Sequence, residues 1–78
     1  MKPKKDRLNV TGRAIQRIRN AAIPKITQDD MVGRLARQGL QINQSQIAKI
    51  ENGGRIVTDY ELVAFAKALR VPITAFFE

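Results

Sequence analysis

Apolar residues recur three and four positions apart in four segments of the chain, a spacing that places them on one face of a helix. The segments and their apolar positions are residues 10–22 with Ile15, Ile18 and Ala22; residues 27–38 with Met31, Val32 and Leu35; residues 43–52 with Ile47 and Ile50; and residues 58–70 with Leu62, Val63, Phe65, Ala66 and Leu69. We expect a last short turn of helix over residues 73–77, and no segment has the alternation of a strand. The pattern predicts an all-α fold of four to five short helices, with the fourth segment the most buried.

Residues that cap helices mark the ends of these segments. Three pairs have the spacing of a capping box, namely Thr27 with Asp30, Asn43 with Gln46, and Thr58 with Glu61. Asn9 and Thr11 are the candidate caps of the first helix. Pro24 ends that helix, and Gly39 and Gly53 are suited to end the second and third helices, since glycine adopts the left-handed conformation found at such stops.

The segment from residue 43 to residue 52 has an unusual outward face. An exposed helix face is usually rich in Glu and Lys pairs, whereas this one begins with Gln44, Ser45 and Gln46. Amides and hydroxyls both donate and accept hydrogen bonds, as the edges of bases require. Considered alone, the segment is better interpreted as ordinary polar surface. Only the rest of the chain favours a base-reading role.

Glu51 lies at the flank of the buried face of the same segment. A lone buried carboxylate is costly, so it needs a cation as its partner. We expect Arg19, in the first segment, to be that partner. Lys25, Arg34 and Arg37 are expected to form a solvated basic face.

The charge of the chain points to a polyanionic partner. Fourteen Lys and Arg residues against seven Asp and Glu give the 78 residues a net charge of +7. Double-stranded nucleic acid is the first candidate, and an anionic membrane or an acidic protein is the second. RNA is disfavoured because the A-form major groove is too narrow for a helix. With one Tyr and three Phe, the chain also lacks the aromatic platforms of single-strand binders.

The absence of Cys and His removes thiol nucleophiles, imidazole bases and the usual zinc ligands. We therefore expect no enzymatic activity, metal, cofactor or small-molecule substrate. No segment reaches the length of a membrane span, and the first residues, MKPKKDR, lack the apolar stretch of a signal peptide. We expect a cytoplasmic protein without membrane contact.

Residues 1–8 are expected to form a flexible basic arm ahead of a domain that spans residues 9–78. Lys2, Lys4, Lys5 and Arg7 supply its positive charge. Such an arm can lie along phosphates or enter a minor groove. A solubilising tail is the alternative interpretation, and composition favours it slightly.

One set of residues narrows the prediction. Thr27-Gln28 is followed by residues 43–53, which read NQSQIAKIENG, and then by Arg55. This set resembles the Xre, Cro and lambda-repressor type of helix-turn-helix domain, with its Thr-Gln helix start and its Ile-x-x-Ile-Glu-Asn-Gly signature. Residues 10–77 can be laid along the whole domain. The resemblance implies a lambda-repressor-like bundle that binds double-stranded DNA and regulates transcription, as a repressor of the bacterial or phage type that associates with the nucleoid.

In this family the third helix lies in the major groove with its N-terminal residues on base edges. The resemblance implies that bases are read by Gln44, Ser45, Lys49, Gln46 and Asn43. It implies phosphate contacts by Gln28, Thr27, Asn52 and Arg55, and a structural ion pair between Arg19 and Glu51. Gln28 would also brace Gln44. For Asn43, a pure capping role remains an equal alternative.

The sequence departs from the family pattern at several positions. The connection between the second and third helices, and the first connection at residues 23–26, are longer than the tight turn of a helix-turn-helix motif. Val32 stands where a small Ala is usual, and Arg70 replaces the usual Gly. These departures concern the angles between helices more than the identity of the reading helix.

A single reading helix spans only a few base pairs, and each good bidentate contact discriminates by about 1–3 kcal/mol. We therefore expect a homodimer on DNA, with half-sites about one helical turn apart. Ile73, Phe76 and Phe77 are the candidate dimer contacts, although core packing is an equal candidate role for two of them. The alternative function is a protein-interaction module, such as an antitoxin or phage regulator whose main partner is another protein.

Overall fold

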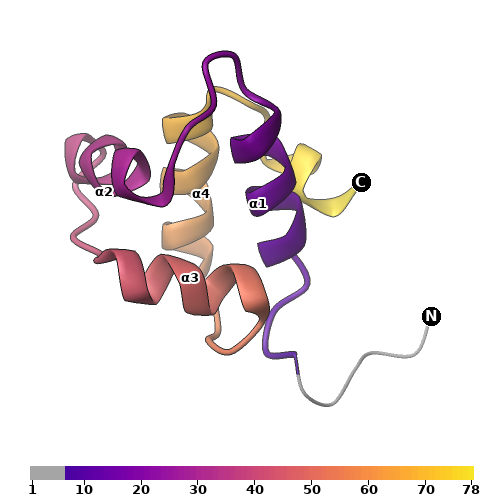
Figure 1. Cartoon of the computed structure of the whole chain (residues 1–78). Coiled ribbons are helices and arrows are strands. Elements are labelled where there is room, and N and C mark those ends of the chain that lie inside the picture. The colour runs from indigo at the N-terminus through magenta and orange to yellow at the C-terminus, as the bar shows by residue number, and fades with distance from the viewer. Residues whose placement is uncertain (1–6) are drawn as a thin grey trace.

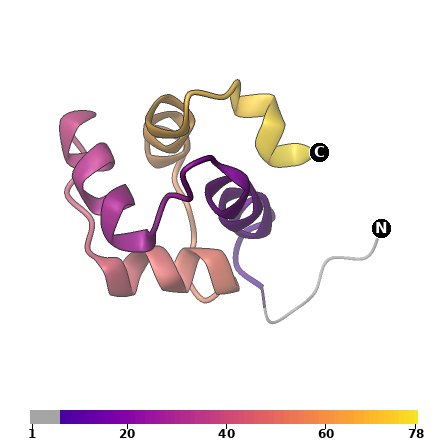
Figure 2. The same cartoon turned by 45° about the horizontal axis from the view of Figure 1, so that its top comes forward.

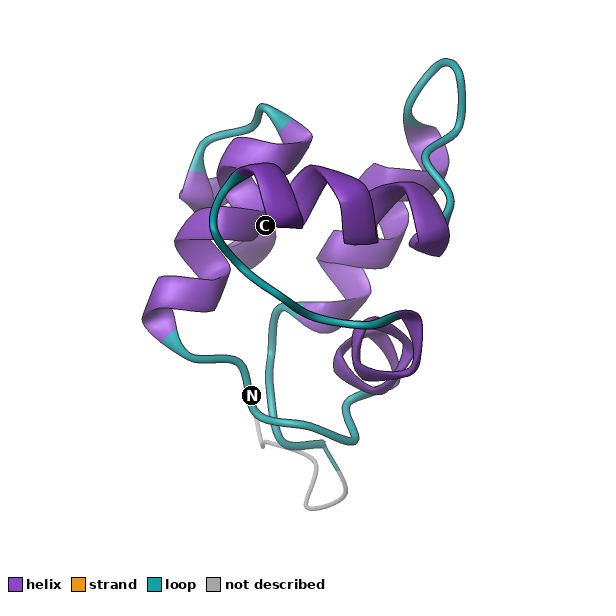
Figure 3. Ribbon diagram, turned by 90° about the vertical axis from the view of Figure 1, so that its left-hand side faces the viewer, coloured by secondary structure: helices purple, strands orange, loops and turns teal. Residues whose placement is uncertain are grey.

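The computed structural model describes residues 7–78, which form four α-helices and a final 3-10 turn (Figure 1). The elements are α1 (Gly12–Ala21), α2 (Gln28–Arg37), α3 (Gln44–Asn52), α4 (Asp59–Leu69) and η1 (Ile73–Phe77). Helices and connecting loops account for all of this part of the chain, without a strand (Figure 3). The all-α prediction is confirmed. No helix within residues 7–78 has the length and apolar character needed to cross a membrane.

α3 lies across the ends of the other helices and packs against both α1 and α2 (Figures 1 and 2). α4 runs beside α1 and also packs against α2. The final turn, η1, closes the bundle by packing on α1 and α4. One side of α3 is therefore covered by the bundle, and the other side forms an edge of the molecule.

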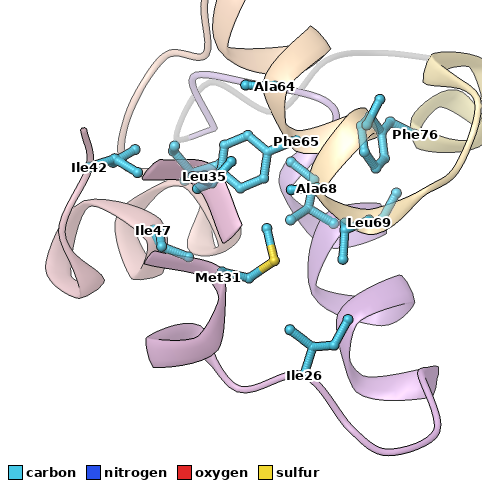
Figure 4. Packing of buried hydrophobic residues seen from close by; sticks show 14 residues of the cluster. Ile26, Met31, Leu35, Ile42, Ile47, Ala64, Phe65, Ala68, Leu69 and Phe76 are labelled. Carbon is cyan, nitrogen blue, oxygen red and sulfur yellow. The ribbon is translucent and has the colours of Figure 1, made fainter. Parts of the chain in front are cut away.

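The core contains most of the apolar positions that the periodicity identifies, together with Ala14, Ile26, Ile42, Ala64 and Ala68 (Figure 4). Its largest fully buried side chains are Phe65, Phe76, Ile15, Met31, Leu35, Ile47 and Ile50. Each contributes about 1.5–3 kcal/mol relative to an exposed side chain. α4 supplies five buried residues, more than any other helix, so its prediction as the most buried element is confirmed. Val63 was wrongly assigned to this face, because 43% of its surface is exposed.

The three predicted capping boxes are present. Thr27, Asn43 and Thr58 each accept a hydrogen bond from the backbone N–H three residues on, and the side chain at that position accepts from the N–H of the cap. The start of α1 differs from the prediction, because Val10 lies outside the helix with 70% of its surface exposed. Thr11 makes no capping bond with its side chain. Asn9 does so instead, since its Oδ1 accepts from the N–H of Gly12 at 2.7 Å.

Two arginines differ from what the family pattern or the sequence predicts. Arg70 adopts the left-handed conformation at the end of α4, with φ 58°, which costs a non-glycine residue roughly 1–2 kcal/mol. Lys25 and Arg37 are exposed as predicted, whereas Arg34 is only partly exposed. Its Nη1 donates to the carbonyl of Ala68 at 3.1 Å and so ties α2 to the end of α4.

Candidate nucleic-acid interface

α3 has two chemically distinct faces. Ile47 and Ile50 are fully buried, and Glu51 is buried beside them. Ser45 and Lys49 are exposed on the other side, and Gln44 is exposed at the start of the helix, on the flank nearer Glu51. The division follows from the helical repeat, which places residues three and four apart on the same side. The apolar side holds α3 on the bundle and leaves its polar side turned away from it.

Asn43 and Gln46 are both engaged in the cap of α3. The Oδ1 atom of Asn43 accepts from the N–H of Gln46 at 2.8 Å, and the Oε1 atom of Gln46 accepts from the N–H of Asn43 at 3.0 Å. The acceptor oxygens of both amides are thus used within the protein. Base contacts by these two residues would use their amide nitrogens or the second lone pair of each oxygen.

Arg19 and Glu51 form the buried ion pair that the sequence suggests. The Nε atom of Arg19 lies 2.8 Å from Oε2 of Glu51, and Nη2 lies 2.9 Å from Oε1. Only 6% and 2% of the two side chains are exposed. Arg19 also donates to the carbonyl of Ile26 at 2.9 Å. This pair fastens the inner side of α3 to α1 and to the segment before α2.

Gln28 links that ion pair to the exposed start of α3. Its Nε2 donates to Oε1 of Glu51 at 2.9 Å, and its Oε1 accepts from Nε2 of Gln44 at 3.4 Å. The second bond is long and lies at the surface. Gln44 is therefore braced on one side and keeps its carbonyl oxygen and one amide hydrogen available for a base edge.

Of the other residues assigned to phosphate contacts, Thr27 and Asn52 lie at the ends of helices, and Arg55 lies in the loop after α3. Thr27 accepts from the N–H of Asp30 at the start of α2. Asn52 is exposed at the end of α3, and its Oδ1 accepts from the N–H of Gly54 at 3.0 Å. Amide and hydroxyl groups at helix ends can donate to phosphate oxygens.

Arg55 is held by an acidic neighbour. Its Nη1 and Nη2 atoms donate to the two carboxylate oxygens of Glu61, at 3.0 and 2.8 Å. This hydrogen-bonded guanidinium holds the pKa of Glu61 below its usual range, and the carboxylate raises the pKa of Arg55. A phosphate would have to compete with Glu61 for these two donors, which would weaken the phosphate contact that the sequence predicts for Arg55.

The candidate dimer contacts divide between core and surface. Phe76 is 1% exposed and packs in the core, so it offers nothing to a second subunit. Ile73 and Phe77 are 37% and 60% exposed. Phe77 lines a shallow hollow whose other apolar lining comes from Leu8, Val10, Val57 and Leu62. Of the three predicted residues, only Ile73 and Phe77 remain available to a partner.

The predicted basic arm lies mostly outside the described residues, which begin at Arg7. Arg7 and Leu8 bond to the end of α3, a contact that the sequence analysis missed. The only local feature of the sequence that points to this contact is Asn9, a candidate cap residue that stands three positions before the first residue of α1. Within residues 7–78, no three His, Cys, Asp or Glu side chains gather as metal ligands would.

The comparisons with known proteins agree with this geometry. A family model for helix-turn-helix domains matches residues 26–76, which include α2, α3 and α4. Neither curated proteins nor solved structures gave a match. The family match and the α2–α3 arrangement show that the chain belongs to the helix-turn-helix family of DNA-binding regulatory domains, of the Xre, Cro and lambda-repressor type.

Proposed function

We propose that the protein is a sequence-specific regulator of transcription, acting as a repressor, and that α3 reads the major groove of double-stranded DNA. The exposed start of α3 carries this proposal: Gln44 and Ser45 are exposed in the first turn of a helix that Ile47, Ile50 and Glu51 fix in the core. A glutamine amide can bond an adenine edge in two places, and a serine hydroxyl suits several edges. Lys49, exposed further along α3, can reach a guanine or a phosphate.

The phosphate contacts that orient α3 are proposed to come from the starts and ends of the neighbouring helices. Thr27 and Gln28 stand at the positive end of α2, and Asn52 stands at the end of α3. The net charge of +7 supplies the long-range attraction to DNA. Arg55 contributes less to the attraction of phosphates than a free arginine would, because its guanidinium is paired with the carboxylate of Glu61.

A homodimer completes the proposal. The few base edges within reach of one α3 cannot select a site in a genome, whereas two copies double the contacts. Phe77, together with the exposed Leu8 and Val10, forms an apolar surface that a second copy of the chain would cover. A two-fold axis would then place the two helices on half-sites about one helical turn apart.

Selection of bound sequences from a random pool of DNA duplexes tests this function. We expect recovery of a palindromic site of two half-sites with a fixed spacing. Its bases would then identify the pairs read by Gln44 and Ser45. Recovery of unrelated sequences, at an affinity equal to that for random DNA, would contradict sequence-specific reading.

A protein-interaction module is the second candidate, and the exposed Ile73, Phe77, Leu8 and Val10 favour it. In that case these side chains would contact a different protein, as in an antitoxin or a phage regulator. A stable complex with a partner protein, combined with a selection that recovers no duplex, would favour this candidate over the first.

A further inference from the structure

The last turn of α3 is bonded by residues that precede α1. A helix ends with four carbonyl groups that have no partner inside the helix. In α3 the carbonyls of Lys49 and Ile50 accept from the N–H groups of Gly54 and Gly53. The carbonyls of Glu51 and Asn52 accept from the guanidinium of Arg7, at 3.4 and 3.2 Å. The positive charge of Arg7 thus stands at the negative end of the helix dipole, where a cation is stabilising.

Asn9 makes three hydrogen bonds that join separate parts of the chain. Its Oδ1 accepts from the N–H of Gly12 at 2.7 Å, at the start of α1. Its Nδ2 donates to the carbonyl of Ile50 at 2.9 Å and to that of Arg55 at 2.8 Å. The amide therefore connects the start of α1, the end of α3 and the loop after α3. Both of its amide hydrogens are used.

The backbone segments around Asn9 lie so close together that the end of α3 cannot shift without displacing α1 or the residues before it. A Cβ atom on Gly12 would lie 2.0 Å from the carbonyl oxygen of Ile50. A Cβ atom on Gly53 would lie 2.8–3.0 Å from three side-chain atoms of Arg7. The N–H of Leu8 donates to the carbonyl of Gly53 at 2.8 Å. We name Arg7, Leu8 and Asn9 the N-terminal clasp.

From these contacts we infer that Asn9 and Arg7 are positioning residues for sequence recognition. The clasp fixes the end of α3 against α1, and the direction of the helix axis then sets where Gln44 and Ser45 stand at the other end. The inference rests on the proposed function for its link to DNA. Asn9 touches no base in this account and acts through Ile50 and Arg55.

A phosphate contact by Arg7 would change the DNA affinity in a different way from a positioning role. If Arg7 bonded a phosphate, its loss would weaken binding to all DNA equally and reduce the dependence of the affinity on salt by about one contact. If Arg7 positions α3, its loss weakens binding to the selected site more than to random DNA. The salt dependence then stays the same.

The test compares Asn9→Ala and Arg7→Met with matched controls, Asn20→Ala and Arg13→Ala, whose side chains are exposed on α1. Arg7→Lys keeps the charge and one donor, and should restore part of the effect. Two measurements are made on each folded variant. The first is affinity for the selected duplex and for a random duplex of equal length, at several salt concentrations. The second is hydrogen exchange at the backbone amides of Gly53 and Gly54, which needs no DNA.

We expect Asn9→Ala to weaken binding to the selected duplex by about tenfold, the scale of one lost hydrogen bond, and to change binding to random DNA by less than about twofold. Exchange at Gly53 and Gly54 should accelerate by about tenfold as well, while both controls stay near the wild type. Arg7→Met should act in the same direction by about threefold. If Asn9→Ala does not fold, Arg7→Met alone decides the outcome.

Two results would overturn the inference. One is an unchanged ratio of selected to random affinity in both folded variants. The other is unchanged exchange at Gly53 and Gly54, which would show that the clasp does not hold α3. If the selection recovers no duplex, the proposed function fails, but accelerated exchange would still support the structural part of the inference.

Discussion

The two ends of α3 differ in how firmly the protein holds them. At its C-terminal end, Glu51 is bonded by Arg19 and Gln28, and the last carbonyls are bonded by the N-terminal clasp. At its N-terminal end, the exposed Gln44 has a single bond of 3.4 Å to another side chain. The difference suggests a division of labour, in which one end fixes the helix and the other end keeps its polar groups for a partner.

Breaking the fixed end should have the largest effect. Glu51→Ala leaves the buried guanidinium of Arg19 without its carboxylate, and we expect a loss of about 3–5 kcal/mol in the free energy of unfolding. For a domain of this size, that loss is comparable with much of the total stability. Urea denaturation followed by circular dichroism measures it.

A double variant serves as the control for this first prediction. Arg19→Met with Glu51→Leu removes both charges and fills the same space, so most of the lost stability should return. A loss below about 1 kcal/mol in Glu51→Ala would contradict the strong anchoring of the C-terminal end.

Removing the cap at the N-terminal end of α3 should destabilise the fold by less than Glu51→Ala does. Asn43→Ala removes the bond to the N–H of Gln46, and we expect a loss of about 1 kcal/mol in the free energy of unfolding. Asn43→Ser, which preserves a capping oxygen, should stay within a few tenths of the wild type. If Asn43→Ser keeps its stability but loses affinity for the selected duplex, Asn43 reads a base as well as capping the helix.

The smallest effect is expected beyond α3, at the partly buried pair of Arg55 and Glu61. The hydrogen bonds from Arg55 hold the pKa of Glu61 below its usual value, so the ionised carboxylate stabilises the folded state at neutral pH. This contribution is lost as the pH falls through the lowered pKa. Glu61→Gln should therefore cost about 0.5–1 kcal/mol at pH 7 and almost nothing once the pH lies below the lowered pKa of Glu61. The pKa of Asp30 is also lowered, by its hydrogen bonds to Thr27. Asp30 is present in both the wild type and the Glu61→Gln variant, so its titration cancels when the two are compared.

Thermal unfolding of the wild type and Glu61→Gln across this range checks the last prediction. The two stability curves should coincide below the lowered pKa of Glu61 and reach their full separation above about pH 4.3, the ordinary pKa of a glutamate. A constant difference at every pH would show that the carboxylate of Glu61 contributes through shape rather than charge.

Local signals made most of the fold predictable from the sequence. A capping box needs only two side chains three residues apart, and Thr27 with Asp30 satisfies it without help from the rest of the chain. The helical repeat likewise identified Ile47 and Ile50 as buried. The Arg19–Glu51 pair could be predicted because a carboxylate at the edge of an apolar face needs a cationic partner. The family resemblance indicated that Arg19 is this partner.

The missed features depend on contacts between distant segments. Val63 and Leu62 are adjacent apolar residues, and only the packing of α4 decides which of them faces solvent. Phe76 and Phe77 pose the same problem in η1, where one position separates core from surface. The capping role of Asn9 was a prediction from the sequence, but its bonds to Ile50 and Arg55 could not be predicted, because those residues lie more than 40 positions away.

The most direct test of the central claim compares Gln44→Ala with the wild type on two duplexes, the selected site and a random sequence. The variant should stay as stable as the wild type within about 0.5 kcal/mol, because the side chain is exposed. It should lose about 1–3 kcal/mol of binding free energy on the selected site and almost none on random DNA. Equal losses on both duplexes would contradict base reading by the exposed end of α3.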